Sequence, residues 1–339
     1  MTLLGNTIRA LCRLAWVWLL VMPLVSCNHK ELEYGGSANV TVQFDWTKAP
    51  QASPASMAMM VYSLSSSPVL ISFQGRNGGS FIVPTGSYQF IGYNDDSHEL
   101  FTRGDNYDSF QIYSQHISLS SFSPMFAQTR DVPRAPNTEG QTVIAEPDPL
   151  WTSATPEATL VSDIENLLTM TMQDAIKTYH FTITNVENLQ YATELAGTIS
   201  GMSEAWVPSA GHGSDLECII PFSLESDGTS TLSGSIRTFG HCPHNTGKED
   251  DAHNDHKLVI YVKMNDGNKY YYTFDVTNSI HATDPGGTSS STTDPDMPPV
   301  TDVDIFLDDV PLPKPLNNGA GIHPEVTEWQ EIEVDINMK

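Results

Sequence analysis

Short runs in which apolar and polar residues alternate recur along this chain, and they limit the folds that it can adopt. In residues 40–46 every even-numbered position is apolar and every odd-numbered position is polar. Residues 332–338 repeat the same pattern. Successive side chains of a β-strand point to opposite faces, so these runs are typical of strands with one buried face. Such strands must pack their apolar faces together, which predicts an all-β fold.

Further strand candidates are separated by residues that favour turns, such as Asn265, Asp266 and Gly267. The candidates are residues 57–64, 69–73, 80–83, 88–93, 178–184, 195–202, 217–224, 231–239, 257–264 and 269–276. Residues 187–195 are expected to form a short helix, and the chain up to residue 145 lacks helical periodicity. Many short strands with little helix predict antiparallel β-sandwiches.

The chain begins with a segment typical of bacterial secretion signals. Arg9 and Arg13 precede an uncharged apolar run over residues 14–25, which is too short to span a bilayer. The run closes on Ser26 and Cys27, and this ending resembles the lipobox, in which the signal is cut before a cysteine that then carries lipid. Residues 1–26 are therefore predicted to be a lipoprotein signal peptide, and Cys27 the lipidation site. The alternative is an ordinary secretion signal followed by an incidental cysteine.

A polar stretch follows Cys27, and residues 27–36 are expected to form an acylated tether. Its lysine and acidic residues resemble the signals that send lipoproteins to the cell surface in the Bacteroidetes group. Several lipid chains on one cysteine hold a protein firmly on a membrane. The expected location is therefore the outer membrane, through a lipid anchor, with the protein exposed at the cell surface.

A stretch rich in proline, threonine and acidic residues separates two sets of strand candidates. It predicts a linker over residues 141–156, between an N-terminal β-sandwich over residues 37–140 and a C-terminal β-sandwich over residues 157–339. Residues 281–304 are predicted to form a disordered acidic loop, because serine, threonine, proline and aspartate dominate there. The carboxylates of residues 294–309 could bind calcium, but a solvated loop is the favoured interpretation.

Charge and cysteine content restrict the partners and the redox chemistry. The chain has 16 basic and 41 acidic residues and a formal net charge of −25, so we expect no nucleic-acid partner. Of the four cysteines, Cys12 lies in the predicted signal and Cys27 is the predicted lipid site. Cys218 and Cys242 could form a disulfide in an oxidising compartment, and spacing alone leaves their pairing open.

The strongest metal-like pattern is a group of histidines around one cysteine, at residues His241, Cys242, His244, His253 and His256. Imidazole and thiolate bind zinc or copper, but the spacing is not that of a zinc finger. A polar loop between two strands explains the group without metal, so no metal or other cofactor is predicted. The sequence also lacks nucleophile-elbow and phosphate-loop motifs, and we expect a protein without enzymatic activity.

Several short motifs occur in order across almost the whole chain after the predicted signal. They are residues 27–34, 44–46, 49–50, 84–88, 93–96, 197–202, 236–240, 274–277 and 321–329. Together they resemble a lipoprotein family of Bacteroidales known as domain of unknown function 5119 and, beyond it, the fimbrillin superfamily of fimbrial subunits and anchors. The resemblance implies two transthyretin-like β-sandwich domains in tandem and a role at the cell surface in fimbriae or adhesion.

The resemblance also implies how subunits could assemble. In fimbrillins that polymerise, an arginine-specific protease removes an N-terminal strand, and the opened sandwich accepts a strand from its neighbour. Here no arginine lies between Cys27 and Arg76, and Arg76 falls in a predicted hairpin turn. This departure favours a fimbrial anchor, an accessory subunit or a tip-like subunit over a stalk subunit. The expected partners are other fimbrial subunits or a ligand on a host or bacterial surface.

The final alternating run is the candidate strand for such a contact. Its apolar residues are Ile332, Val334, Ile336 and Met338. It could be donated to another subunit or form an exposed edge, and the alternative is that it completes the protein's own sheet, because edge strands are usually protected.

A carbohydrate-binding lipoprotein of a glycan-uptake system is the alternative function. Trp151, Trp206 and Trp329 could stack on sugars, although packing in a sandwich core is the more common role of tryptophan.

Overall fold

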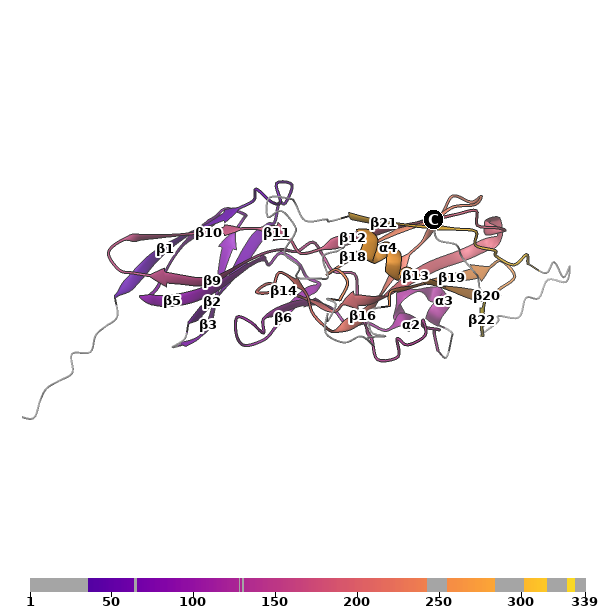
Figure 1. Cartoon of the computed structure of the whole chain (residues 1–339), viewed down its shortest axis with the longest axis horizontal. Helices are drawn as coiled ribbons and strands as arrows, with labels where there is room; N and C mark the ends of the chain where they lie inside the picture. Colours follow the sequence, from indigo (N-terminus) through magenta and orange to yellow (C-terminus); the bar gives the residue numbers. More distant parts are fainter. Residues whose placement is uncertain are drawn as a thin grey trace, which may run out of the picture.

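The computed structural model describes residues 36–63, 66–127, 129, 131–242, 255–283, 302–315 and 328–332. Strands dominate these residues and are arranged in five sheets, which confirms the predicted all-β fold. Figure 1 shows an elongated molecule in which two sets of packed strands lie end to end. The helices in this part of the chain are short, and none of them has the length and apolar character needed to cross a membrane.

The first sandwich packs a three-stranded sheet, with the order β10-β1-β4, against a five-stranded sheet, with the order β11-β9-β5-β2-β3. The strands are β1 (Ser37–Asp45), β2 (Ser56–Ser63), β3 (Ser66–Gln74), β4 (Gly78–Pro84), β5 (Gly86–Asn94), β9 (Trp151–Leu160), β10 (Glu165–Thr171) and β11 (Gln173–Asp174). Their facing side chains form one apolar cluster, to which Val40, Met57 and Phe90 belong. The even-numbered side chains of β1 are buried in it, as the alternation predicts.

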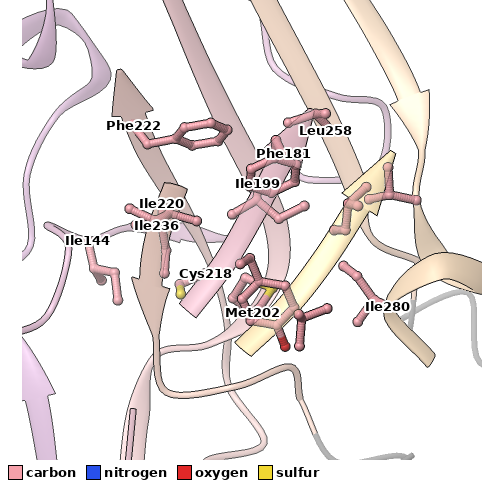
Figure 2. Close-up of a cluster of buried hydrophobic side chains, with 14 of the residues drawn as sticks. Ile144, Phe181, Ile199, Met202, Cys218, Ile220, Phe222, Ile236, Leu258 and Ile280 are labelled. Atoms are coloured by element: carbon pink, nitrogen blue, oxygen red, sulfur yellow. The ribbon is translucent and has the colours of Figure 1, made fainter. Parts of the chain in front are cut away.

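The second sandwich packs a sheet with the order β17-β18-β12-β21 against a sheet with the order β22-β20-β19-β13-β16-β8. The strands are β8 (Thr142–Val143), β12 (Lys177–Thr184), β13 (Ala192–Ser203), β16 (Glu217–Ser223), β17 (Glu225–Ser226), β18 (Leu232–Thr238), β19 (Lys257–Met264), β20 (Lys269–Asp275), β21 (Asp302–Asp308) and β22 (Trp329–Glu331). Figure 2 shows its core, where side chains of both sheets, among them Phe181, Ile199 and Phe222, converge. The rings of Phe181 and Phe222 stack with their centroids 4.8 Å apart.

The two sandwiches repeat one topology. The first strand of each lies inside the smaller sheet, antiparallel to one neighbour and parallel to the other: β1 lies between β4 and β10, and β12 lies between β18 and β21. The larger sheets follow the corresponding orders β9-β5-β2-β3 and β20-β19-β13-β16. The parallel pairs make these sheets mixed and not purely antiparallel. Side-chain alternation has the same period in both kinds of pairing, so the sequence did not reveal this difference.

A fifth sheet joins the two sandwiches and has the order β15-β14-β7-β6. Its strands are β6 (Leu100–Arg103), β7 (Gln111–Ser114), β14 (Ala205–Val207) and β15 (His212–Gly213). The helical segments are α2 (Leu119–Phe122), α3 (Pro124–Ala127), the 3₁₀ turn η2 (Leu189–Tyr191) and α4 (Thr277–Thr283). Only η2 lies where a helix was expected, because segments as short as α2 and α3 leave no helical periodicity in a sequence.

Strand pairing corrects the predicted domain boundaries. β9 pairs with β5 and β10 pairs with β1, so residues 151–171 belong to the first sandwich and not to a C-terminal sandwich over 157–339. In the opposite sense, β7 and β8 pair with β14 and β16 of the second half, so the range 37–140 is wrong as well. The predicted linker over 141–156 contains β8 and the start of β9. The chain leaves the first sandwich after β5, adds strands to the second and then returns.

β21 corrects the C-terminal end of the predicted acidic loop over 281–304. Val303, Ile305 and Leu307 are buried, while Asp302 and Asp304 point outward. The aspartates of the outer face thus made an alternating strand look like a solvated loop. Residues 281–283 belong to α4, and residues 284–301 lie outside the described residues.

Candidate functional site

The strand nearest to the predicted lipid site is β1. Cys27 lies outside the described residues, which begin at residue 36, and β1 begins at Ser37. Residues 37–43 pair with β4 and residues 39–45 pair with β10, so main-chain hydrogen bonds hold both edges of the strand. The even-numbered side chains from position 38 to position 44 are at most 4% exposed. The chain that follows the predicted lipid site therefore leads directly into an internal strand.

Arg76 is the first arginine after the predicted lipid site, and neighbouring groups enclose it. Its guanidinium lies over the ring of Trp46, 4.9 Å from the centroid, and its Nη1 donates to the carbonyl of Ala52. The indole Nε1 of Trp46 donates in turn to the carbonyl oxygen of Arg76 at 2.8 Å. Arg76 lies between β3 and β4, which belong to different sheets, so the predicted hairpin turn is in fact a crossover between layers. Cleavage at an arginine beyond Cys27 therefore could not remove β1 alone.

Only the beginning of the candidate C-terminal contact strand is described. β22 precedes it and pairs in parallel with β20 at the edge of the six-stranded sheet. The N–H of Ile332 donates to the carbonyl of Tyr271 at 3.1 Å, and the Ile332 side chain packs against the main core cluster. Val334, Ile336 and Met338 lie outside the described residues. Donation of this strand to another subunit stays a prediction.

Cys218 and Cys242 are both free, buried thiols in the structure. Cys218 lies in β16 opposite Met202, and the Sγ of Cys242 lies 3.6 Å from the carbonyl oxygens of Met202 and Ser214. Burial raises the pKa of Cys242 to about 12, and burial also raises the pKa of Cys218. Both thiols are therefore protonated and poorly reactive at neutral pH. The disulfide that the sequence left open is not formed here, and its formation on oxidation stays a prediction.

The structure divides the group of histidines and cysteine. His241 and His256 lie together with their ring centroids 5.5 Å apart, whereas the thiol of Cys242 contacts backbone carbonyls. His244 and His253 lie outside the described residues. A histidine that the sequence analysis did not include, His281 of α4, brings its Nε2 within 3.1 Å of the Nε2 of His256. The described part of the chain therefore gathers three histidines at one place.

Comparison with known proteins now identifies the family. A family model described as Domain of unknown function (DUF5119) matches residues 26–223, which is more than half of the chain. The chain belongs to this family. The resemblance noted from the sequence motifs is thereby confirmed.

Two relatives extend the likeness of this DUF5119 protein beyond residue 223. A curated protein of Bacteroides ovatus, named as a candidate fimbrium anchoring subunit, Fim4B, is 20% identical over 338 residues, which cover 94% of this chain and 96% of the relative. The crystal structure of a candidate adhesin from Bacteroides ovatus ATCC 8483 matches with a TM-score of 0.59 at 18% identity, covering 86% of this chain and 99% of that one. The structural match shows that the two chains share a fold.

The three tryptophans considered for sugar binding are packed within the DUF5119 protein. Trp206 is 7% exposed, and its Nε1 donates to Thr152 at 3.0 Å. Trp151 lies edge to face with Trp46, and Trp329 packs against an aromatic pair from α3 and β19. These rings contribute to the core, so the geometry gives no support to the carbohydrate-binding alternative.

An open sheet edge is a feature that the sequence analysis missed. β3 is an end strand of the five-stranded sheet, and Val69 and Leu70 in it are 49% and 54% exposed. β3 contains no charged residue, and Pro68 is its one residue of a type that protects edges. The corresponding strand of the second sandwich, β16, is covered by β8. The uncharged run was visible in the sequence, but its position at an edge depends on the pairing of distant strands.

Proposed function

We propose that this protein is a lipid-anchored fimbrial anchor or accessory subunit of the outer membrane, exposed at the cell surface, that acts in adhesion without enzymatic activity. Its two sandwiches would be two domains, and Cys27 would carry the lipid. The observation that carries the proposal is the match, over 94% of this chain, to a relative named as a candidate fimbrium anchoring subunit. The family and the shared fold are in keeping with it.

The position of β1 supports the anchoring part of the proposal. An anchor must transmit force from the lipid to the folded protein. In β1 the ladders to β4 and β10 run side by side along seven residues each, so a pull along the strand loads many hydrogen bonds at once. The chain has no arginine between Cys27 and Arg76 at which a protease could detach this strand. An anchor must keep its first strand, whereas a stalk subunit of the fimbrillin type must lose it.

The partner in this proposal is another fimbrial subunit. Its contact would use an open edge of a sheet, because an added strand gains main-chain hydrogen bonds and places alternate side chains in pockets. The uncharged edge of β3 and the run from Ile332 to Met338 are the two candidate edges. β3 is the better supported of the two, since it is described along its whole length and its outer side lacks a neighbouring strand among the described residues.

The test is to replace Cys27→Ala in the native bacterium, with Cys12→Ala as the matched control. Both changes remove a thiol, but only Cys27 lies at the predicted cleavage and lipidation site. We expect the Cys27→Ala strain to release fimbriae or the subunit into the medium, and the Cys12→Ala strain to behave like the parent. Immunoblots of outer-membrane and medium fractions, with antibodies against the fimbrial shaft, measure this. A Cys27→Ala protein that stays membrane-bound and holds fimbriae as the parent does would exclude lipid anchoring at this residue.

A further inference from the structure

Three histidines from separate segments meet beside the second sandwich. His241 follows β18, His256 immediately precedes β19, and His281 lies in α4. One imidazole nitrogen of each lies within 4.8 Å of the corresponding nitrogens of the other two. His241 and His256 are 6% and 1% exposed, and His281 is partly buried. Polar side chains are rarely buried together in this way unless they share a partner.

Backbone carbonyls orient two of the three rings. The Nδ1 of His256 lies 3.3 Å from the carbonyl oxygen of Ser200, and the Nδ1 of His241 lies 3.0 Å from that of Cys242. A carbonyl only accepts, so each Nδ1 carries the proton and each neutral ring presents a lone pair at Nε2. Histidines that bind metal through Nε2 are usually held by such a bond from the other ring nitrogen.

The spacing agrees with ligands around one small cation. Zinc binds histidine nitrogen at about 2.0–2.1 Å, so two such nitrogens on a tetrahedron lie about 3.3 Å apart. The Nε2 atoms of His256 and His281 are 3.1 Å apart. The ring centroids of the three pairs lie 5.0, 5.3 and 5.5 Å apart, so the third ring faces the same point.

The backbone makes room for this arrangement at Gly201. β13 has a bulge between Ile199 and Met202, and Gly201 within it has a φ of +76°. A Cβ at this position would lie 2.6 Å from the Nδ1 of His256. Bulges often aim side chains at functional sites, and here the bulge lets the His256 ring lie against the strand.

We propose that His241, His256 and His281 bind one Zn²⁺ through their Nε2 atoms, with water in the fourth position. Imidazole is a preferred ligand of zinc, and three histidines with one open position are an established ligand set for it. The metal would tie α4 to the start of β19 and to the segment after β18. This site is independent of the proposed fimbrial role, since it involves neither β1 nor the edge of β3.

The test measures Zn²⁺ binding to the full chain, purified without a histidine tag, by competition with a chromophoric chelator. We expect one zinc per chain and a loss of affinity of at least about 100-fold in His281→Ala, because removing one ligand exceeds the 10- to 100-fold effect of altering a supporting group. His98→Ala, an exposed histidine, is the matched control and should leave the affinity unchanged. A His244→Ala, His253→Ala double variant should also bind as the parent does.

Two results would overturn the proposal. One is a parent chain that binds Zn²⁺ no more tightly than His281→Ala, and the other is a double variant at positions 244 and 253 that loses affinity as much as His281→Ala does. A second measurement does not depend on whether any variant folds. Co²⁺ added to the parent chain should give the strong visible absorption of a four-coordinate site, and weak absorption typical of six-coordinate Co²⁺ would exclude the proposed geometry.

Discussion

Buried thiols make the state of the two cysteines measurable residue by residue. Burial raises the pKa of both Cys218 and Cys242, so little reactive thiolate is present at neutral pH. We expect iodoacetamide to label neither residue in the folded protein and both residues in denaturant without a reductant. Mass spectrometry of the peptides that contain each cysteine measures the labelling. Denatured protein that takes up the label at these positions only after reduction would show instead that the two residues form a disulfide.

A single carboxylate organises the turn between β17 and β18. The side chain of Asp227 accepts hydrogen bonds from the N–H groups of Thr229, Ser230 and Thr231 at 2.8, 2.9 and 2.9 Å. The bond from Thr231, followed by that from Thr229, lowers the pKa of Asp227 below its usual value of 3.8. Because the pKa is lower in the folded state, the stabilisation is complete above the unfolded value and is lost as the pH falls through the folded value.

Asp227→Asn should therefore be less stable than the parent at neutral pH, and the difference should shrink as the pH falls below about 4. Urea unfolding at a series of pH values measures it. Asp163→Asn is a suitable control, because Asp163 is also an exposed turn residue and has no resolved pKa shift. A difference between Asp227→Asn and the parent that stays constant down to about pH 2 would show that the ionised carboxylate is not its cause.

At the scale of elements, the sequence was informative where burial follows a simple period. β1 and β12 alternate cleanly and were predicted within a few residues. β9 contains Pro156 and Glu157 and lacks an apolar run, so it was taken for part of a linker. It is a strand because β5 and β11 supply its hydrogen bonds from both sides. Of the histidine group, His281 could not be predicted, because it meets the others only through the packing of α4.

β1 can be tested as a separable element. A chain that starts at Thr47 lacks the strand and would expose the pocket that Val40, Val42 and Phe44 fill. We expect this truncated chain to aggregate or unfold in its first sandwich, because three large apolar groups and both ladders are lost. A synthetic peptide of residues 36–46 should restore the folded state in trans, as the donated strand does in strand complementation.

The rescue is measured by circular dichroism and by co-elution of the labelled peptide. A peptide in which Val40 and Val42 are replaced by aspartate is the matched control and should not bind, because its ladder is intact but two buried positions carry charges. If the truncated chain folds fully without any peptide, β1 is dispensable and the proposed path of force from the anchor is wrong.

At the scale of the whole molecule, the fifth sheet and the loop beside it make one unit of the two sandwiches. Tyr62 of β2 lies on the outer face of the first sandwich, with its ring centroid 6.1 Å from that of Tyr107 and 6.4 Å from that of Phe110. Both partners lie between β6 and β7, which pair onward to β14 of the second half. Glu204 strengthens the same junction, since its buried carboxylate binds Arg103 at 3.0 Å. The apolar cluster is continuous from β2 into the second core.

This continuity predicts that the molecule unfolds as one unit and that Tyr62→Ala uncouples its halves. Loss of a buried aromatic side chain costs about 3–5 kcal/mol, and here most of that loss falls on the junction. Differential scanning calorimetry should show one transition for the parent and two for Tyr62→Ala. Tyr62→Phe is the matched control: the Tyr62 hydroxyl is buried without a hydrogen-bond partner among the described residues, so its removal should leave stability unchanged or raise it by up to about 1 kcal/mol. A single transition in Tyr62→Ala at the temperature of the parent would mean that the fifth sheet couples the sandwiches without these rings.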